Sequence, residues 1–404
     1  MSLRNRNIWK SVYSTLFISR VISGFLQVVM FAFVARELGS SNFGPMMSAL
    51  VTVQLIGTVL EFGFGSLLMS RRFFIEERHL TGTLLSSNIL ISGLEAACGI
   101  FSYLLLPIRG HFLPALALLL VWGAGERLTN LGLSFAISQS DPQEVRRNIL
   151  SRRFLTFTFF SIITVEYTWS DLRFCFFLAV SSAAGGLISV FRYRDHLTAI
   201  NWKYFRVLLK LGFPFQINSI LNQFRNLDVL LLNFFATSMV AGTFALALRF
   251  SQPFSIPMSA LAQTGITAIS SNDPTLRNEF LTRYLRVLKY CIFFGFIVFL
   301  CPAQSIANRL LPNYPTIDFS FKLQVFAFIL FGVIATEISI LQAIGEQRFL
   351  YRISTLLILM TLTLTATGGR FFGVVGASTG LFIGNLIQSV VLYRFRCMKS
   401  EFYE

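Results

Sequence analysis

Residues 208–250 read LLKLGFPFQINSILNQFRNLDVLLLNFFATSMVAGTFALALRF, and this stretch decides the expected fold. Most of it is apolar enough to lie in lipid, yet four polar side chains share one face at helical spacing: Asn218, Asn222, Arg225 and Asn226. A charged side chain at the bilayer centre costs about 2.5–3.5 kcal/mol on insertion scales, so it faces a partner or a water-filled cavity. The stretch therefore predicts a membrane-spanning helix with a polar face.

A second stretch with a similar layout lies about half a chain earlier, from Ser19 to Ala49. Its polar face is formed by four residues at helical spacing: Arg20, Ser23, Gly24 and Gln27. Two such stripes inside apolar helices predict side chains that line one shared, water-accessible chamber. Arg20 and Gln27 are the candidate substrate contacts on this stripe.

The composition is that of an integral membrane protein. Of 404 residues, 54% are hydrophobic and 13% are charged, whereas ordinary soluble domains are about 25% charged. The mean hydropathy is +0.66. The net charge of +15 is by itself compatible with nucleic-acid binding, but the positions of the charges indicate membrane topology instead. We therefore expect contact with membrane lipids and none with nucleic acid.

The chain shows no residue pattern for a metal or cofactor. Its five cysteines form no CxxC pair, and its three histidines lack ligand spacing. We expect no metal site, no cofactor and no enzymatic activity. The apolar run from Val12 to Val34 follows a basic N-terminus but is longer than a signal-peptide core, so it is interpreted as the first retained span.

Twelve apolar segments predict an all-α membrane protein with twelve transmembrane helices. They are 12–34, 45–69, 83–106, 113–138, 154–168, 174–191, 207–234, 239–268, 287–307, 322–345, 353–367 and 372–393. The segments at 154–168 and 353–367 are short for a span, and we expect both to extend into their basic flanks.

The basic residues predict the orientation of these spans. When the N-terminus is placed in the cytoplasm, a large majority of the 34 lysines and arginines fall on the cytoplasmic side. Both termini are then cytoplasmic. Four arginines remain within spans: Arg20, Arg127, Arg225 and Arg249. Because no connection is long enough for a soluble domain, any activity must reside in the helix bundle or at its mouths.

The chain looks internally duplicated. Gly39–Pro45 and Ala236–Gly242 occupy equivalent turns in the two halves, and Gly44 aligns with Gly242. Six spans per half give both halves the same orientation, so we expect a pseudo-two-fold axis along the membrane normal. The predicted organisation is an N-terminal six-helix lobe at 1–195, a cytoplasmic linker at 196–210 and a C-terminal six-helix lobe at 211–404.

The arginines within spans allow two interpretations each. Arg225 either lines a cavity for an anionic substrate or forms a structural ion pair with Asp228, three residues on. Arg20 either lines the same cavity or snorkels toward the cytoplasmic face. Arg249 precedes Pro253, and a proline bend marks a binding or hinge region in carriers, although it also serves plain packing.

The acidic residues within spans are candidates for proton or ion coupling, together with Asp228. Glu126 and Arg127 are adjacent and so must point in different directions on a helix, one toward the cavity and one toward a neighbouring helix, and Arg127 is a candidate substrate contact. Glu95 and Glu337 stand alone in spans three and ten, where each either carries a proton or hydrogen-bonds to a neighbouring helix. Glu61, beside two glycines in Phe62–Gly65, is interpreted as part of a close helix contact.

Several short motifs resemble those of one transporter family. They are Ala35–Gly44, Glu61–Gly65 followed by Arg71 and Arg72, Leu211–Pro214 continuing to Asp228, Ala343–Arg348, and Gly373–Ala377. Over nearly the full length, the chain resembles the polysaccharide-transporter branch of the MOP superfamily, and most of all the Wzx-type O-antigen or capsule-unit flippases.

That resemblance implies a MATE-like bundle of two six-helix lobes, alternating access and a bacterial inner-membrane location. It implies an undecaprenyl-pyrophosphate-linked oligosaccharide as cargo, a cationic central cavity, and a polysaccharide polymerase and chain-length regulator as candidate partners. By position, Arg20 and Arg225 fit such a cavity. The sugar and the coupling ion stay open.

Two other function classes compete with this one. A multidrug and toxin exporter would depend on acidic cavity residues, whereas here arginines rival the acids. A membrane-embedded polysaccharide polymerase or glycosyltransferase commonly needs a large extracytoplasmic loop, and the predicted outside loops are short.

Overall fold

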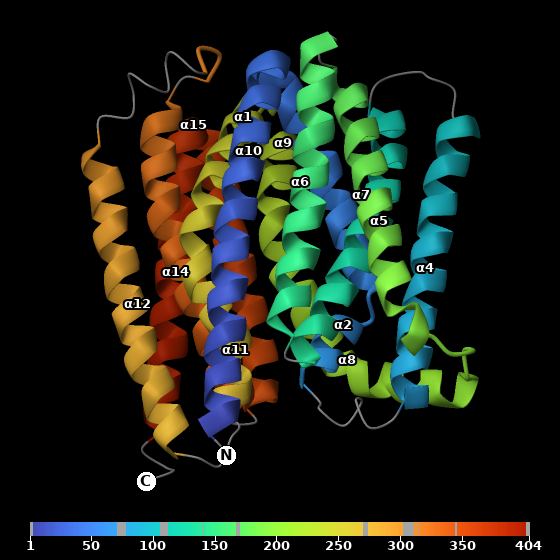
Figure 1. Ribbon diagram of the computed structural model, residues 1–404. Helices are drawn as coiled ribbons and strands as arrows, with labels where there is room; N and C mark the ends of the chain where they lie inside the picture. Colours follow the sequence, from blue (N-terminus) through green and yellow to red (C-terminus); the bar gives the residue numbers. More distant parts are fainter. Residues whose placement is uncertain are drawn as a thin grey trace. The chain divides into compact units, whose positions relative to one another are not determined.

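The computed structural model describes residues 3–70, 78–105, 112–139, 141–166, 170–269, 274–301, 311–314, 316–343 and 346–400. All regular secondary structure among them is helical (Figure 1). The contacts group the chain into two compact units. Unit 1 comprises Met1–Gly44 and Leu227–Glu404, and unit 2 comprises Pro45–Asn226. The lobes predicted at 1–195 and 211–404 were defined by the order of the spans and not by contacts, so they stay a prediction.

Unit 2 is one uninterrupted segment of the chain. It begins with the C-terminal limb of α1 (Leu3–Leu60) and ends in the short 3-10 helix η2 (Arg225–Leu227). Between them lie α2 (Phe64–Ser70), α4 (Arg78–Leu105), α5 (Phe112–Ser138), α6 (Pro142–Glu166), α7 (Asp171–Tyr193), η1 (Arg194–His196) and α8 (Trp202–Phe224). Its core includes the buried side chains of Phe64, Leu84 and Phe135.

Unit 1 combines the N-terminal limb of α1 with the helices after η2. These are α9 (Asp228–Phe235), α10 (Ser238–Ser251), η3 (Gln252–Ser255), α11 (Ile256–Ile269), α12 (Pro274–Leu300), α14 (Ile317–Ala343) and α15 (Gln347–Ser400). Its core includes Met258, Phe280 and Ile329. The limb of α1 is held by Tyr314, whose hydroxyl donates to the Ala35 carbonyl at 2.9 Å.

Two helices are too long to be single spans, and each is bent at a glycine. Gly39 in α1 has φ 70° and Gly373 in α15 has φ 62°, in the left-handed region that glycine adopts without strain. A span needs about 20 residues, so the apolar stretches of 48 and 50 residues in these helices suffice for two spans each. The bends separate the expected segments 12–34 from 45–69, and 353–367 from 372–393.

The apolar helices confirm a multi-pass membrane protein. Five stretches of the described residues are long and apolar enough to span a bilayer: Tyr13–Leu60, His79–Leu104, Asp171–His196, Ile317–Gln342 and Phe349–Met398. The two short segments do extend into their basic flanks. The fifth span begins at Pro142 in α6, and the eleventh begins at Gln347 in α15.

A short 3-10 helix interrupts both the seventh and the eighth segment, in the eighth at η3 (Gln252–Ser255). The break in the seventh corrects the expectation that its polar side chains share one continuous helical face. The α-helix of span seven ends at Phe224, η2 covers Arg225–Leu227, and α9 begins at Asp228. A 3-10 helix has 3.0 residues per turn in place of 3.6, so residues after Phe224 rotate away from the face of α8. The side chains of Asn218, Asn222 and Arg225 lie outside the described residues.

The glycines aligned between the two halves meet in unit 1. A β-carbon on Gly44 would lie 3.0 Å from the Gly242 nitrogen, and one on Gly242 would lie 3.1 Å from the Gly44 nitrogen. Because both approaches are to backbone, neither position has room for a side chain. The backbone of α1 just after its bend at Gly39 therefore packs directly against the backbone of the first turns of α10.

Candidate functional site

Two adjacent charged residues on α5 serve two different neighbours. Arg127 donates from Nη2 to Glu95 Oε2 on α4, and the side chains of this pair are 4% and 2% exposed. Glu126 accepts from Arg152 Nη1 on α6 at 2.8 Å. The prediction that Glu126 and Arg127 point in different directions is confirmed. Together they tie α5 to α4 on one side and to α6 on the other.

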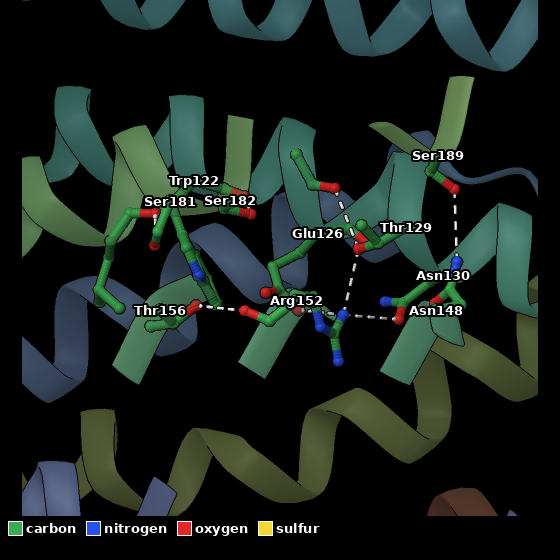
Figure 2. Close-up of polar contacts among 12 residues, drawn as sticks. Trp122, Glu126, Thr129, Asn130, Asn148, Arg152, Thr156, Ser181, Ser182 and Ser189 are labelled. Carbon is green, nitrogen blue, oxygen red and sulfur yellow. Dashed lines mark hydrogen bonds and ion pairs between the residues drawn. The ribbon is translucent and has the colours of Figure 1, made fainter. Parts of the chain in front are cut away.

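Arg152 is the centre of a polar network that the sequence did not reveal (Figure 2). Besides Glu126, its Nη1 donates to Thr129 Oγ1 at 3.1 Å and to Asn130 Oδ1 at 3.3 Å. The sequence placed Arg152 in a basic flank outside the membrane. Because α6 begins at Pro142, the residue instead lies ten positions into the helix. Its charge is matched by Glu126, so the network holds helices together.

Neutral hydrogen bonds extend this network to α7 (Figure 2). Ser182 Oγ donates to the Trp122 carbonyl at 3.0 Å, and Asn148 Nδ2 donates to Ser189 Oγ at 3.4 Å. Small polar side chains of this kind let membrane helices approach closely and bond across their interfaces. Trp122, Asn148, Ser182 and Ser189 are buried, so these bonds lie in a packed helix interface, whereas Asn130 at the other end of the network is exposed.

The Glu95–Arg127 pair is incompletely satisfied. Within the described residues, Glu95 Oε1 and the Arg127 atoms Nε and Nη1 are buried without a hydrogen-bond partner. Glu61, at the end of α1, is a second carboxylate close enough to interact electrostatically with Arg127. Glu95 and Arg127, expected as a coupling candidate and a substrate contact, are therefore partners of each other.

Asp228 and Arg249 form a second charged group, in unit 1. Asp228 is 3% exposed, and its Oδ1 accepts from the Val229 amide at 2.7 Å. Arg249 lies close enough to interact electrostatically with it. The arginine also donates from Nη1 to Gln252 at 3.2 Å and lies 5.1 Å from the centre of the Phe31 ring. One cation near Asp228 thus comes from α10, while the predicted pair of Asp228 with Arg225 involves a side chain outside the described residues.

Glu337 on α14 is the centre of a third charged group, also in unit 1. It is fully buried, accepts from the Tyr284 hydroxyl on α12 at 3.0 Å, and lies 2.9 Å from Arg396 Nε on α15. Glu95 and Glu337, isolated in the sequence, each receive an arginine from another helix. Neither stands alone in the fold.

The remaining predicted contacts do not join these groups. Arg20 and Gln27 lie partly buried on the N-terminal limb of α1, where each has interactions with other groups. Asn218, Asn222 and Arg225 have no described side chain. Among the described residues, no group of three histidine, cysteine or acidic side chains is arranged to hold a metal ion.

Comparison with known proteins decides the family. The model of the polysaccharide biosynthesis protein family matches residues 8–266. The chain belongs to this family. The match covers well over half of the chain, including the first seven predicted spans and nearly all of the eighth. No curated protein sequence matches the chain significantly.

Solved structures with the same fold are transporters. One is described as the inward-facing conformation of a multidrug resistance MATE family transporter of the MOP superfamily, with TM-score 0.71, 12% identity, and coverage of 96% of this chain and 97% of that one. A MOP superfamily transporter from Pyrococcus furiosus is described as having a binding pocket of reverse polarity. Its TM-score is 0.69 at 16% identity, with coverage of 97% of this chain and 96% of that one. A third structure, a MATE multidrug transporter in complex with R6G, has a TM-score of 0.71 at 12% identity, with coverage of 96% of this chain and 94% of that one. The chain has the all-α MATE fold.

Proposed function

We propose that this protein is a flippase that moves an undecaprenyl-pyrophosphate-linked oligosaccharide repeat unit, of the O-antigen or capsule type, across the bacterial inner membrane by alternating access. The family match carries the proposal, because a polysaccharide biosynthesis family here adopts a fold found in membrane transporters. A pyrophosphate headgroup cannot cross hydrocarbon unaided, since burying an unpaired charge is prohibitively costly. Building a polysaccharide on a lipid carrier therefore requires a transporter.

Arg249 is the best supported phosphate contact among the predicted arginines. Arg127 is 5% exposed and bonded to Glu95, which neutralises it. Arg249 is only partly buried and lies beside the helix interruption at Gln252–Ser255. Guanidinium groups bind phosphate through two parallel N–H bonds, and interrupted helices mark substrate sites in carriers. We assign Arg249 to the pyrophosphate and Gln252 to the same site.

Transport of the lipid-linked oligosaccharide in proteoliposomes tests the proposal. The substrate is isolated from a strain that lacks the gene and accumulates it, and an external glycosidase reports what has crossed. The wild type is expected to expose the sugar on the far side. A wild type that leaves the sugar inaccessible would overturn the proposal.

A matched set of variants tests the assignment of Arg249. Arg249→Ala is combined with Asp228→Asn so that no buried charge is left unpaired, and transport is expected to fall by about 10-fold or more, the worth of a charged hydrogen bond. Arg36→Ala removes an exposed arginine and should leave transport unchanged. Arg225→Ala, which the sequence predicts to keep the fold and lose export, belongs in the same assay. Transport by the double variant at the wild-type rate would remove Arg249 from the site.

The same vesicles separate the drug-exporter alternative, which the structural likeness to multidrug MATE transporters favours. Movement of an organic cation dye without movement of the lipid-linked sugar would support that alternative. Movement of the sugar alone would support the flippase.

A further inference from the structure

Arg127 bonds to one carboxylate and interacts electrostatically with a second that is not in hydrogen-bond contact with it. Its Nη2 donates to Glu95, while Glu61 interacts with it only over a longer distance. The arginine also approaches the α1 backbone, because a β-carbon on Gly57 would lie 3.9 Å from Nη2. The guanidinium therefore lies between an acid on α4 and an acid at the end of α1.

Unpartnered polar atoms converge on this point. Glu95 Oε1 and Arg127 Nε and Nη1 are buried without a hydrogen-bond partner in the described part of the chain, on side chains only 2% and 4% exposed. A buried polar atom without a partner costs about 1–3 kcal/mol, and more when it is charged. Three such atoms at one ion pair can accept or donate a further hydrogen bond.

Among the described residues of unit 2, no basic side chain other than Arg127 forms an ion pair with Glu61 or Glu95, and the basic residues of α8 (Lys203, Arg206 and Lys210) are exposed. From α6, the Arg152 guanidinium is engaged by Glu126 on the other side of α5. From α7, the neighbouring group is the Ser182 hydroxyl, which donates to a carbonyl, and α2 contains no titratable side chain. When all three groups are ionised, Glu61, Glu95 and Arg127 thus carry one net negative charge. In a low-dielectric interior that charge is costly, and a single proton removes it.

Glu61 lies where the second span breaks. Phe62 has φ 53° and Gly63 has φ 68° between α1 and α2. On α8, Gln216 Nε2 donates to the Thr58 and Val59 carbonyls, both at 2.9 Å, and so satisfies acceptors freed by the break. A change in the bonding of Glu61 therefore acts directly on a joint between α1, α2 and α8.

We propose that Glu61, Glu95 and Arg127 form a binding site for one exchangeable proton. Uptake places a proton from water on a Glu95 carboxylate oxygen, breaks its charged bond to Arg127, and frees the guanidinium to pair with Glu61. Release of the proton reverses the exchange, and Arg127 stays protonated throughout. The site stands on the geometry of unit 2 alone, whereas its use in driving transport rests on the proposed function.

Infrared difference spectroscopy of the purified full-length protein, stepped between acidic and alkaline buffer, tests the site through the C=O stretch of a protonated carboxyl. The buffers are stepped between about pH 6 and pH 9, above the range in which exposed carboxyls titrate. Glu61→Gln and Glu95→Gln should each lower the titrating signal of the wild type by one carboxyl, because the remaining acid and Arg127 then form a neutral pair. Arg127→Met should raise the signal by about one carboxyl, because two carboxylates then lack a cation. Glu144→Gln, at a surface pair, should leave it unchanged.

A titrating signal that neither Gln variant lowers would overturn the proposal. If Arg127→Met fails to fold, which thermal unfolding in detergent reveals, the two Gln variants still decide. Transport of the lipid-linked oligosaccharide, together with a signal that neither Gln variant lowers, would refute the proton site and leave the flippase standing. A signal lowered by both Gln variants of a protein that moves no lipid-linked sugar would support the site and refute the flippase.

Discussion

The two compact units each bury a carboxylate against an arginine from another helix, but they do so to different degrees. In unit 1, Glu337 accepts a hydrogen bond from Tyr284 at 3.0 Å on one oxygen, and its other oxygen lies 2.9 Å from Arg396 Nε in an ion pair that lacks hydrogen-bond geometry. In unit 2, Glu95 has a partner on one oxygen, and Arg127 leaves two nitrogens unbonded within the described residues. We call the first group closed, because each oxygen of its carboxylate contacts another side chain, as expected of a fixed structural contact. We call the second open, because one oxygen of Glu95 contacts no hydrogen-bond partner, as expected of a group that changes partners.

The largest expected effect is on the closed group. Arg396→Met leaves Glu337 fully buried beside only a tyrosine hydroxyl, and breaking a buried pair in this way costs about 3–5 kcal/mol. Thermal unfolding in detergent should show a large fall in the midpoint, largely restored by adding Glu337→Gln. An Arg396→Met variant as stable as the wild type would remove the distinction between the two groups.

An intermediate effect compares the two carboxylates directly. Glu337→Gln disturbs both a hydroxyl and a guanidinium contact, so it is expected to lower the free energy of unfolding by about 1–3 kcal/mol. Glu95→Gln should cost less, because Glu61 is available to pair with Arg127. The two midpoints are measured side by side at the same pH, and a larger loss for Glu95→Gln would contradict this order.

The smallest expected effect is at the surface of unit 2. Arg147 pairs with Glu144 at 2.9 Å along one turn of α6, and its side chain is 59% exposed. Such pairs contribute at most about 0.5 kcal/mol. Arg147→Ala should therefore leave the unfolding midpoint within error, and it calibrates the other two comparisons. A loss as large as that of Glu337→Gln would show that burial is not what separates them.

The sequence was a good guide to whatever depends on local periodicity. Hydropathy located the helices, and adjacency alone predicted that Glu126 and Arg127 face different neighbours. The turn near Gly39 was visible because glycine is the residue that adopts the required backbone conformation. These features are set within one or two helical turns of the chain.

Features that depend on distant residues were not visible. The partner of Glu337 is Arg396, and no spacing rule connects two residues on separate spans. The helix around Arg152 was expected only as an extension of the apolar run 154–168, and hydropathy does not indicate how far such a charged extension reaches. The break at Arg225–Leu227 has neither proline nor glycine to announce it, so a single helical face was drawn across it.

The contact between Tyr314 and Ala35 has a consequence for biosynthesis. The phenol that holds the N-terminal limb of α1 is 279 residues further along the chain. At about 5–20 residues per second, the ribosome needs roughly 15–60 seconds to reach it. During that interval the first span lacks this contact, while all of unit 2 and the helices α9–α12 of unit 1 are synthesised and inserted. The N-terminal limb of α1 is therefore expected to complete its contacts only late in synthesis.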